Sequence, residues 1–239
     1  MIPKIIHYCW FGYGEMPESA KKCVASWQEF MPDYEYKLWD EDGFDVDAVP
    51  YTKEAYEAKK YAFVSDYVRL WALNNEGGIY LDTDVEVFKP FDDLLKFDAF
   101  AGFEGSKHLP IGTCVMASKA NGMWVGEMLD AYLDRRFVKE DGSYDLTTNV
   151  QFIMEKMCEQ GFAMNGKEQD YKDLHVFPVD YFSPRHTTGE YKRTENTFCD
   201  HLGMGSWTDM KGGWKVKMGR IVGPRAMVAM IKMKRKLFG

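Results

Sequence analysis

The sequence has no long hydrophobic run and no cysteines at metal-binding or redox spacing. None of its 239 residues lies in a stretch near the roughly 20 apolar residues that a membrane-spanning helix needs. Its first apolar run is too brief for a secretory signal. The five cysteines are far apart and lack CxxC spacing, which predicts reduced thiols in a cytoplasmic protein rather than a disulfide framework or a zinc site. With 46% hydrophobic residues, the chain is long enough for a substantial core.

Acidic side chains are missing from the C-terminal end, although the net charge of the chain is −7. From Met210 onward there are nine Lys and Arg residues and no Asp or Glu. They are mixed with Met, Ile, Leu and Phe, which predicts a basic amphipathic helical tail over residues 211–239, after a main domain over residues 1–210. Such a tail suits an anionic membrane surface, or it packs on its own domain. The acidic main body argues against nucleic-acid binding.

Hydrophobic periodicity alternates between strand-like and helix-like segments along the main domain. Strands are expected at residues 4–11, 34–39, 79–81, 85–88, 99–103 and 113–117. Helices are expected at residues 17–30, 61–75, 123–137 and 147–160, and Gly77 or Gly78 is expected to end the second of them. This alternation predicts an α/β layer fold whose sheet is mostly parallel in its first half. In such sheets, ligands collect beyond the carboxyl ends of the strands.

Two carboxylates one residue apart, Asp82 and Asp84, follow the apolar stretch 79–81. Successive strand residues point to opposite faces, so we expect these two side chains to project the same way. Mg²⁺ and Mn²⁺ prefer carboxylate, phosphate and water oxygens, so the pair suits one such cation beside a phosphorylated substrate. A DxD motif alone is a weak signal, because Asp is common in turns.

Three further features have both a functional and a structural interpretation. Asp66 and Arg69 share one helical face, and taken alone they fit a surface ion pair worth under about 1 kcal/mol. Trp10, at the end of the first strand, fits a core or rim residue. The segment 201–207, HLGMGSW, combines an imidazole, a hydroxyl and an indole, and it also fits an ordinary glycine turn.

The order of three sequence blocks resembles glycosyltransferase family 32 over about residues 1–210. The blocks are IPKIIHYCWFG near the start, SDYVRLWALNNEGGIYLDTDVE next and HLGMGSW near the end. That family includes bacterial capsule and cell-surface polysaccharide enzymes and fungal mannosyltransferases. The resemblance implies the GT-A fold, a Rossmann-like mixed sheet flanked by helices that binds a nucleotide-sugar with a divalent cation.

The resemblance also implies roles for residues near the donor sugar. Trp10 matches the position whose ring stacks on the nucleobase, and Tyr80 falls where an aromatic ring lies against the nucleotide. Asp66 and Arg69 match the pair that holds hydroxyls of the transferred sugar. Asn149 is a candidate acceptor-side or sugar-face residue, and its alternative is a helix N-terminal residue that satisfies backbone donors.

The remaining implied roles concern the metal and the diphosphate. Asp82 matches the carboxylate that meets ribose and sugar hydroxyls, and Asp84 matches the metal ligand. Ser206 and Trp207 match a loop that closes on the diphosphate. His201 falls near a position that completes the metal shell or approaches the phosphates. Many relatives carry a second His directly after it, where this sequence has a leucine.

The implied activity is a metal-dependent, retaining glycosyl transfer from a nucleotide-sugar to a glycan or lipid-linked glycan acceptor. A UDP-sugar is favoured over GDP-mannose, and the expected role is capsular or cell-surface polysaccharide synthesis at the cytoplasmic face of the membrane. Two alternatives stay open. One is a haloacid-dehalogenase-like phosphatase, although Glu86 stands where those motifs usually have Thr or Val. The other is a non-catalytic nucleotide-sugar or carbohydrate-binding protein.

Overall fold

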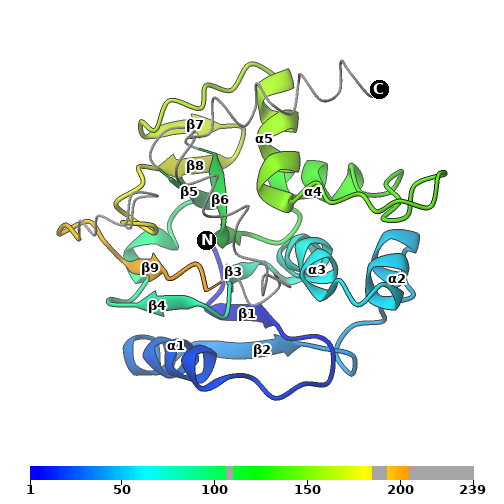
Figure 1. The fold of residues 1–239 in the computed structure, drawn as a ribbon. Helices are drawn as coiled ribbons and strands as arrows, with labels where there is room; N and C mark the ends of the chain where they lie inside the picture. The colour runs from blue at the N-terminus through cyan, green and yellow to red at the C-terminus, as the bar shows by residue number, and fades with distance from the viewer. Residues whose placement is uncertain (106–109, 185–192, 205–239) are drawn as a thin grey trace, which may run out of the picture.

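The computed structural model describes residues 1–105, 110–184 and 193–204, and within these residues a seven-stranded mixed sheet forms the centre of the fold (Figure 1). Its strand order is β2-β1-β3-β6-β5-β8-β7. The strands are β1 (Ile5–Cys9), β2 (Glu35–Trp39), β3 (Gly78–Leu81), β5 (Ala99–Phe103), β6 (Ile111–Ser118), β7 (Gln169–Tyr171) and β8 (Leu174–Phe177). β1 runs parallel to β2 and β3, whereas β6 runs antiparallel to β3 and β5. The predicted mixed α/β sheet is therefore confirmed.

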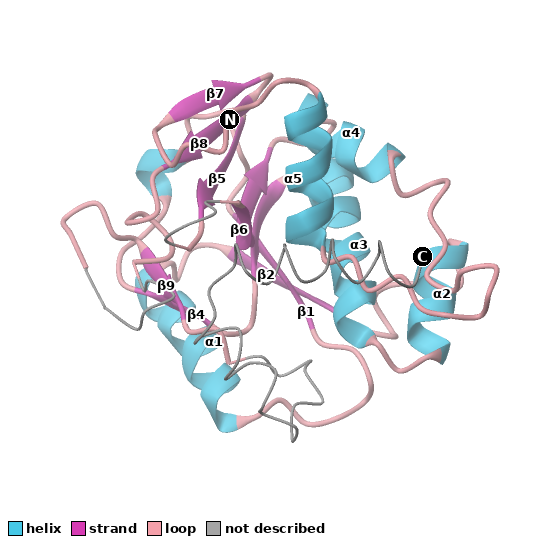
Figure 2. Cartoon of the chain, turned by 45° about the horizontal axis from the view of Figure 1, so that its top comes forward, coloured by secondary structure: helices cyan, strands magenta, loops and turns pink. Residues whose placement is uncertain are grey.

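Helices cover both faces of this sheet, as Figures 1 and 2 show. They are α1 (Glu18–Phe30), α2 (Pro50–Glu57), α3 (Tyr61–Glu76), α4 (Met123–Asp130) and α5 (Asn149–Glu159), with a short 3₁₀ turn η1 (Asp92–Leu94). α2 to α5 pack on one face, and α1 packs on the other with a two-stranded sheet of β4 (Val85–Val87) and β9 (Cys199–His201). Ile79 and Tyr80 illustrate the strand alternation, because these neighbours belong to opposite apolar clusters.

A tight turn joins α3 to β3, the strand that leads into the DxD motif. Gly77 and Gly78 both have positive φ values, 68° and 113°, which glycine adopts without strain. A Cβ atom at Gly78 would lie 2.7 Å from the carbonyl oxygen of Ile5. The predicted glycine stop of the helix is therefore confirmed, and it sends the chain straight into the sheet.

The predicted helix over residues 123–137 is too long. α4 ends at Asp130, and the chain then turns so that Tyr132 and Phe137 pack on Tyr51, with ring centroids 5.0 Å and 5.9 Å away. These contacts with a residue far away in the sequence outweigh the local helical pattern. The sequence patterns also missed α2, β7, β8 and β9.

Two further observations concern the thiols and the membrane. All five cysteines are free. Within the described ranges, no helix has both the length and the apolar composition needed to cross a bilayer. The predicted basic tail over residues 211–239 lies outside the described residues.

Candidate functional site

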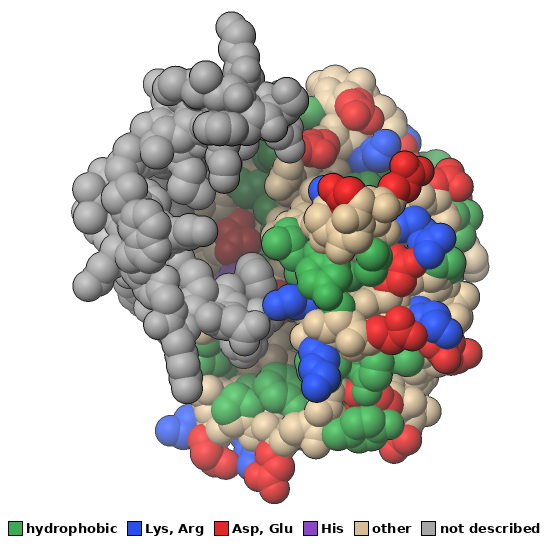
Figure 3. Space-filling view, turned by 45° about the vertical axis from the view of Figure 1, so that its right-hand side comes forward, with side chains coloured by type: hydrophobic (Ala, Val, Ile, Leu, Met, Phe, Trp, Pro, Cys, Tyr) green, Lys and Arg blue, Asp and Glu red, His purple; other side chains and the backbone are tan. Residues whose placement is uncertain are grey.

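A cleft of about 600 Å³ opens beyond the carboxyl ends of β1 and β3. Its walls come from the loop after β1, the first turns of α3, the DxD turn, the neighbouring ends of β5 and β6, and the first turn of α5. Figure 3 shows acidic and histidine side chains deep in a hollow of the surface. The cleft lies where ligands are expected on sheets of this kind.

Asp66, Arg69 and Asp82 form a cluster in this cleft, in which Asp66 and Arg69 are buried and Asp82 is partly exposed. Arg69 Nη2 lies 2.9 Å from Asp66 Oδ1 and 3.4 Å from Asp82 Oδ1. The side chains of Asp66 and Arg69 are only 12% and 6% exposed, so the interpretation as a surface ion pair is wrong. Burial raises the pKa of the Asp66 carboxyl, and the charge of Arg69 works in the opposite direction.

The guanidinium of Arg69 is fully engaged with the protein. Its Nη1 donates to the carbonyl oxygen of Thr113 at 2.9 Å, its Nε donates to that of Ser65 at 3.2 Å, and its Cζ lies 4.6 Å from the centre of the Tyr80 ring. The Tyr80 hydroxyl donates to Asp82 Oδ1 at 2.9 Å. Arg69 therefore holds two carboxylates in position, and Tyr80, although it lines the cleft, is only 2% exposed.

Asp82 and Asp84 lie in a turn rather than in a strand. β3 ends at Leu81, and the Val85 N–H donates to the Asp82 carbonyl oxygen at 3.0 Å to close the turn. The two carboxylates reach the same cleft, as expected, but through the turn and not through strand alternation. Asp84 Oδ1 lies 3.3 Å from Nε2 of His201, and Asp84 Oδ2 accepts the Met204 N–H at 2.9 Å.

His201 reaches Asp84 because β4 and β9 pair, with Val85 opposite His201. The other ring nitrogen of His201, Nδ1, lies 2.8 Å from Glu104 Oε1. Burial alone would lower the pKa of His201, but the acidic groups around the ring outweigh burial and raise it above its usual value. For Asp84, burial is likewise outweighed by hydrogen bonds from His201 and the Met204 N–H, which lower its pKa.

Asp82, Asp84 and His201 fit a divalent cation. One ligand atom from each lies within 4.8 Å of the others. Two carboxylates and an imidazole suit Mn²⁺, and the carboxylates alone suit Mg²⁺. The family resemblance assigned Asp84 and His201 to the metal, and the structure adds Asp82 to this candidate ligand set.

Asn149 supports Asp66 rather than capping its own helix. Its backbone N–H donates to Asp66 Oδ2 at 3.0 Å, and its side-chain amide donates to the Tyr132 hydroxyl at 2.9 Å. The cap of α5 is Thr148, whose hydroxyl accepts the Gln151 N–H. Asn149 lines the cleft and is 1% exposed, so the capping interpretation of this residue is wrong.

Trp10 lies on the rim of the cleft, at the end of β1. Its indole N–H donates to the carbonyl oxygen of Gly14 at 2.6 Å, and the Gly12 N–H donates to Glu41 Oε1 at 2.6 Å. These bonds hold the loop around the indole ring. Ser206 and Trp207, predicted for the diphosphate, lie outside the described residues.

Among the cleft residues that the sequence patterns missed are Glu104 and Cys114, whose side chains lie close to His201. Glu104 had a usable signal, because it is a carboxylate that directly follows an apolar strand, as Asp82 does. Cys114 had none, because it lies inside β6 among apolar neighbours. Only the pairing of β5 with β6 and of β4 with β9 brings both near His201.

Replacing Glu104 by alanine is expected to weaken Mn²⁺ binding by about 10- to 100-fold, because carboxylates behind a metal-binding imidazole fix its orientation and tautomer. Glu104→Gln keeps an acceptor oxygen and should lose less. Isothermal titration of the metal-free protein measures both, with Glu86→Ala as the control, because Glu86 is exposed on β4. Wild-type affinity in the Glu104→Ala protein would contradict a positioning role.

Comparisons with known proteins give a family match over part of the chain. Residues 17–101 match the family described as "Glycosyltransferase sugar-binding region containing DXD motif", a range that includes Asp66, Arg69, Asp82 and Asp84. The chain is similar, with 37% identity over 103 residues, to inositol phosphoceramide mannosyltransferase 3 of Schizosaccharomyces pombe. That alignment covers 41% of this chain and 29% of the fungal protein.

Two other similarities extend further along the chain. Subversion of eukaryotic traffic protein A of Legionella pneumophila is 27% identical in an alignment of length 193 that covers 66% of this chain and 29% of that protein. The chain thus spans 29% of the length of each of these two relatives. The crystal structure of a glycosyltransferase involved in the glycosylation of the major capsid of PBCV-1 superposes with a TM-score of 0.50 at 12% identity, over 86% of this chain and 95% of that one. This likeness supports the fold alone.

Proposed function

We propose that this chain, whose residues 17–101 match the DXD-containing sugar-binding region of glycosyltransferases, transfers a sugar from a nucleotide-sugar donor to a glycan or lipid-linked glycan acceptor. One observation carries this proposal. The Asp66–Arg69–Asp82 cluster and the Asp84–His201 pair open into one cleft beyond the ends of the parallel strands. The first cluster presents carboxylate acceptors for sugar hydroxyls, and the second presents cation ligands for a diphosphate.

We propose that Asp82, Asp84 and His201 hold Mn²⁺ or Mg²⁺. The bound cation would offset the negative charge that develops on the departing diphosphate. Asp66, which Arg69 and Asn149 hold in place, accepts hydrogen bonds from the transferred sugar. Trp10 on the rim offers an indole face for the nucleobase. Ser206 and Trp207 are proposed as donors to the diphosphate.

We propose transfer with retention of configuration, as the family resemblance implies. The bond between the sugar C1 and the diphosphate oxygen breaks, and a bond forms between C1 and the acceptor hydroxyl oxygen on the same face. The acceptor proton passes to a diphosphate oxygen, so this step needs no dedicated protein base. The buried carboxylates keep the sugar oriented during transfer, which is the main contribution of pre-formed geometry.

For the donor we propose a UDP-sugar first and GDP-mannose second. The fungal relative is named as an inositol phosphoceramide mannosyltransferase. That name supports GDP-mannose as the second candidate donor and a lipid-linked acceptor. Capsular or cell-surface polysaccharide synthesis at the cytoplasmic membrane face is the biological role that we propose.

A thermal-shift panel of nucleotide-sugars with and without Mn²⁺ tests the donor. A ligand present at about 100 times its dissociation constant stabilises the native state by about 2.7 kcal/mol, so the true donor should raise the melting temperature clearly, and more with metal. Release of the nucleoside diphosphate during incubation with acceptors separates an enzyme from a non-catalytic binder. If the whole panel leaves the melting temperature unchanged, the proposed function is wrong.

We also propose that the basic tail over residues 211–239 binds anionic membranes, the alternative being that it packs on its own domain. Removing the residues after Val222 is expected to release the protein from vesicles that contain anionic lipid, since each Lys or Arg near such a surface contributes about 1 kcal/mol. Co-sedimentation with anionic and neutral vesicles measures this. If the full-length protein sediments with neither kind of vesicle, membrane attachment through the tail is ruled out.

A further inference from the structure

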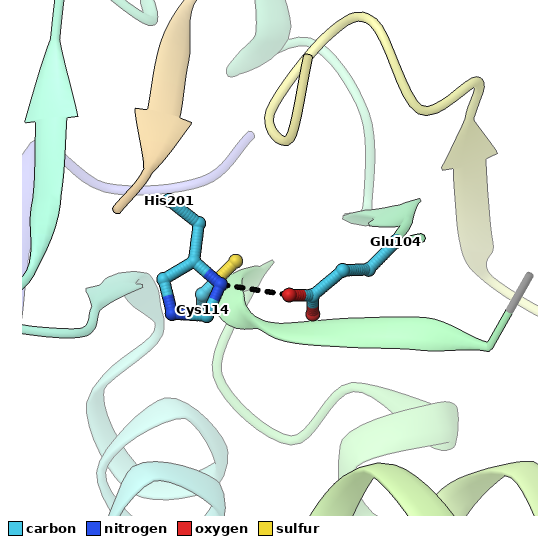
Figure 4. Close-up of side chains that lie close together, drawn as sticks. All are labelled: Glu104, Cys114 and His201. Carbon is cyan, nitrogen blue, oxygen red and sulfur yellow. Dashed lines mark hydrogen bonds and ion pairs between the residues drawn. The ribbon is translucent and has the colours of Figure 1, made fainter. Parts of the chain in front are cut away.

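We propose that Glu104, Cys114 and His201 form a second metal site, which takes a thiophilic divalent cation such as Zn²⁺ and competes for His201 with the carboxylate site. Glu104 directly follows β5, Cys114 lies in β6, and His201 ends β9 (Figure 4). One ligand atom from each lies within 4.8 Å of the others, and Glu104 Oε1 is 2.8 Å from His201 Nδ1. Figure 4 shows the sulfur and the carboxylate both near Nδ1 of the imidazole.

The chemistry of these three donors differs from that of the carboxylate site. A thiolate, an imidazole and a carboxylate are all ligands of Zn²⁺, and three protein ligands leave its fourth position for water. Thiolate favours Zn²⁺ over Mg²⁺ and Mn²⁺, which prefer oxygen. All three residues line the cleft, so a cation can enter from solvent.

The Cys114 side chain is buried and lines the cleft. A cysteine binds a metal ion as its thiolate, so metal binding at this position releases the thiol proton. The neighbouring Ser183 hydroxyl lies 3.9 Å from the sulfur, so a serine at position 114 would have a polar neighbour.

The two sites share one imidazole through opposite nitrogens. Asp84 faces Nε2 of His201 at 3.3 Å, whereas Glu104 faces Nδ1. A neutral imidazole has one nitrogen lone pair and one N–H. If Nδ1 binds Zn²⁺, the proton stays on Nε2 and is donated to Asp84. If Nε2 binds Mn²⁺, the proton stays on Nδ1 and is donated to Glu104. The neutral ring therefore serves one cation at a time.

Zinc should consequently weaken Mn²⁺ binding and inhibit sugar transfer. The inhibition rests on the proposed function, but the site and the competition do not. Both can be measured as metal binding to the full chain, in the absence of any sugar substrate. A negative transferase assay would therefore not contradict the zinc site, and a negative zinc titration would not contradict the proposed sugar transfer.

The test begins with metal-free full-length protein titrated with Co²⁺, an optical substitute for Zn²⁺. Ligation by Cys114 should give the intense near-ultraviolet absorption of a cobalt–thiolate bond. Cys114→Ser should remove that band and weaken Zn²⁺ binding by about 100-fold, because a metal-binding thiolate is lost. The matched control is Cys158→Ser, since Cys158 is exposed and lies outside the cluster. A wild-type protein with no thiolate band would overturn the site, whether or not the variants fold.

Competition is measured by electron paramagnetic resonance of Mn²⁺ bound to the same protein. One equivalent of Zn²⁺ should raise the apparent dissociation constant of Mn²⁺ by at least about tenfold, because it removes one of three ligands. Cys114→Ser should abolish this effect while it still binds Mn²⁺. An Mn²⁺ affinity that Zn²⁺ leaves unchanged would overturn the shared-imidazole inference.

Discussion

Replacing Asp84 by alanine is expected to lower metal-dependent turnover by about three orders of magnitude while the chain stays folded. Asp84 Oδ1 lies 3.3 Å from Nε2 of His201, and the Asp84 side chain is 19% exposed. A catalytic cation contributes several kcal/mol to charge stabilisation in the transition state, and each 1.36 kcal/mol corresponds to a tenfold change in rate. Removing this ligand should therefore be the most damaging single change to catalysis in the cleft.

The measurement is release of the nucleoside diphosphate at saturating Mn²⁺, together with Mn²⁺ affinity from titration. Asp84→Asn keeps the size and the hydrogen bond from the Met204 N–H, and it separates lost charge from lost packing. Glu86→Ala is the matched control, because Glu86 is the exposed carboxylate of the adjoining β4. An Asp84→Ala protein with full metal-dependent turnover would rule out the proposed metal site.

Replacing Arg69 by alanine is expected to lower the free energy of unfolding by about 3–5 kcal/mol, because it leaves buried carboxylates without their counter-ion. Arg69 is the cation beside both Asp66 and Asp82, and its side chain is 6% exposed. The carbonyl oxygen of Thr113 also loses its donor. Donor-sugar binding should fall as well, because both carboxylates lose the guanidinium that positions them.

Urea unfolding monitored by tryptophan fluorescence measures this change. Lys119→Ala is the matched control, since its ion pair with Asp98 is exposed and is worth at most about 1 kcal/mol. Arg69→Lys keeps the charge but loses the planar fork, so it should fall between wild type and alanine. If Arg69→Ala costs no more than Lys119→Ala, the guanidinium is not the structural centre of the site.

Local patterns predicted most of the first half of the fold. The helix before the DxD motif, its glycine stop and the strands on either side all follow from short-range periodicity and turn chemistry. The later strands β7 and β8 were missed, because they are only three and four residues long and carry little pattern of their own. The helix over residues 123–137 was extended too far, because packing on Tyr51 ends it at Asp130.

Sequence patterns were enough to find the chemical groups of the site: two carboxylates after a buried strand, a charged pair on the preceding helix, and a late histidine. The folded structure shows how these groups are arranged. It buries Asp66 and Arg69, so their ion pair is part of the protein interior and not a surface ion pair. It also paired β4 with β9, which puts His201 between the Asp84 carboxylate and the Glu104–Cys114 side of the cleft. Spacing along the chain could not predict that His201 lies between these groups, because this contact depends on strand pairings between segments about 100 residues apart.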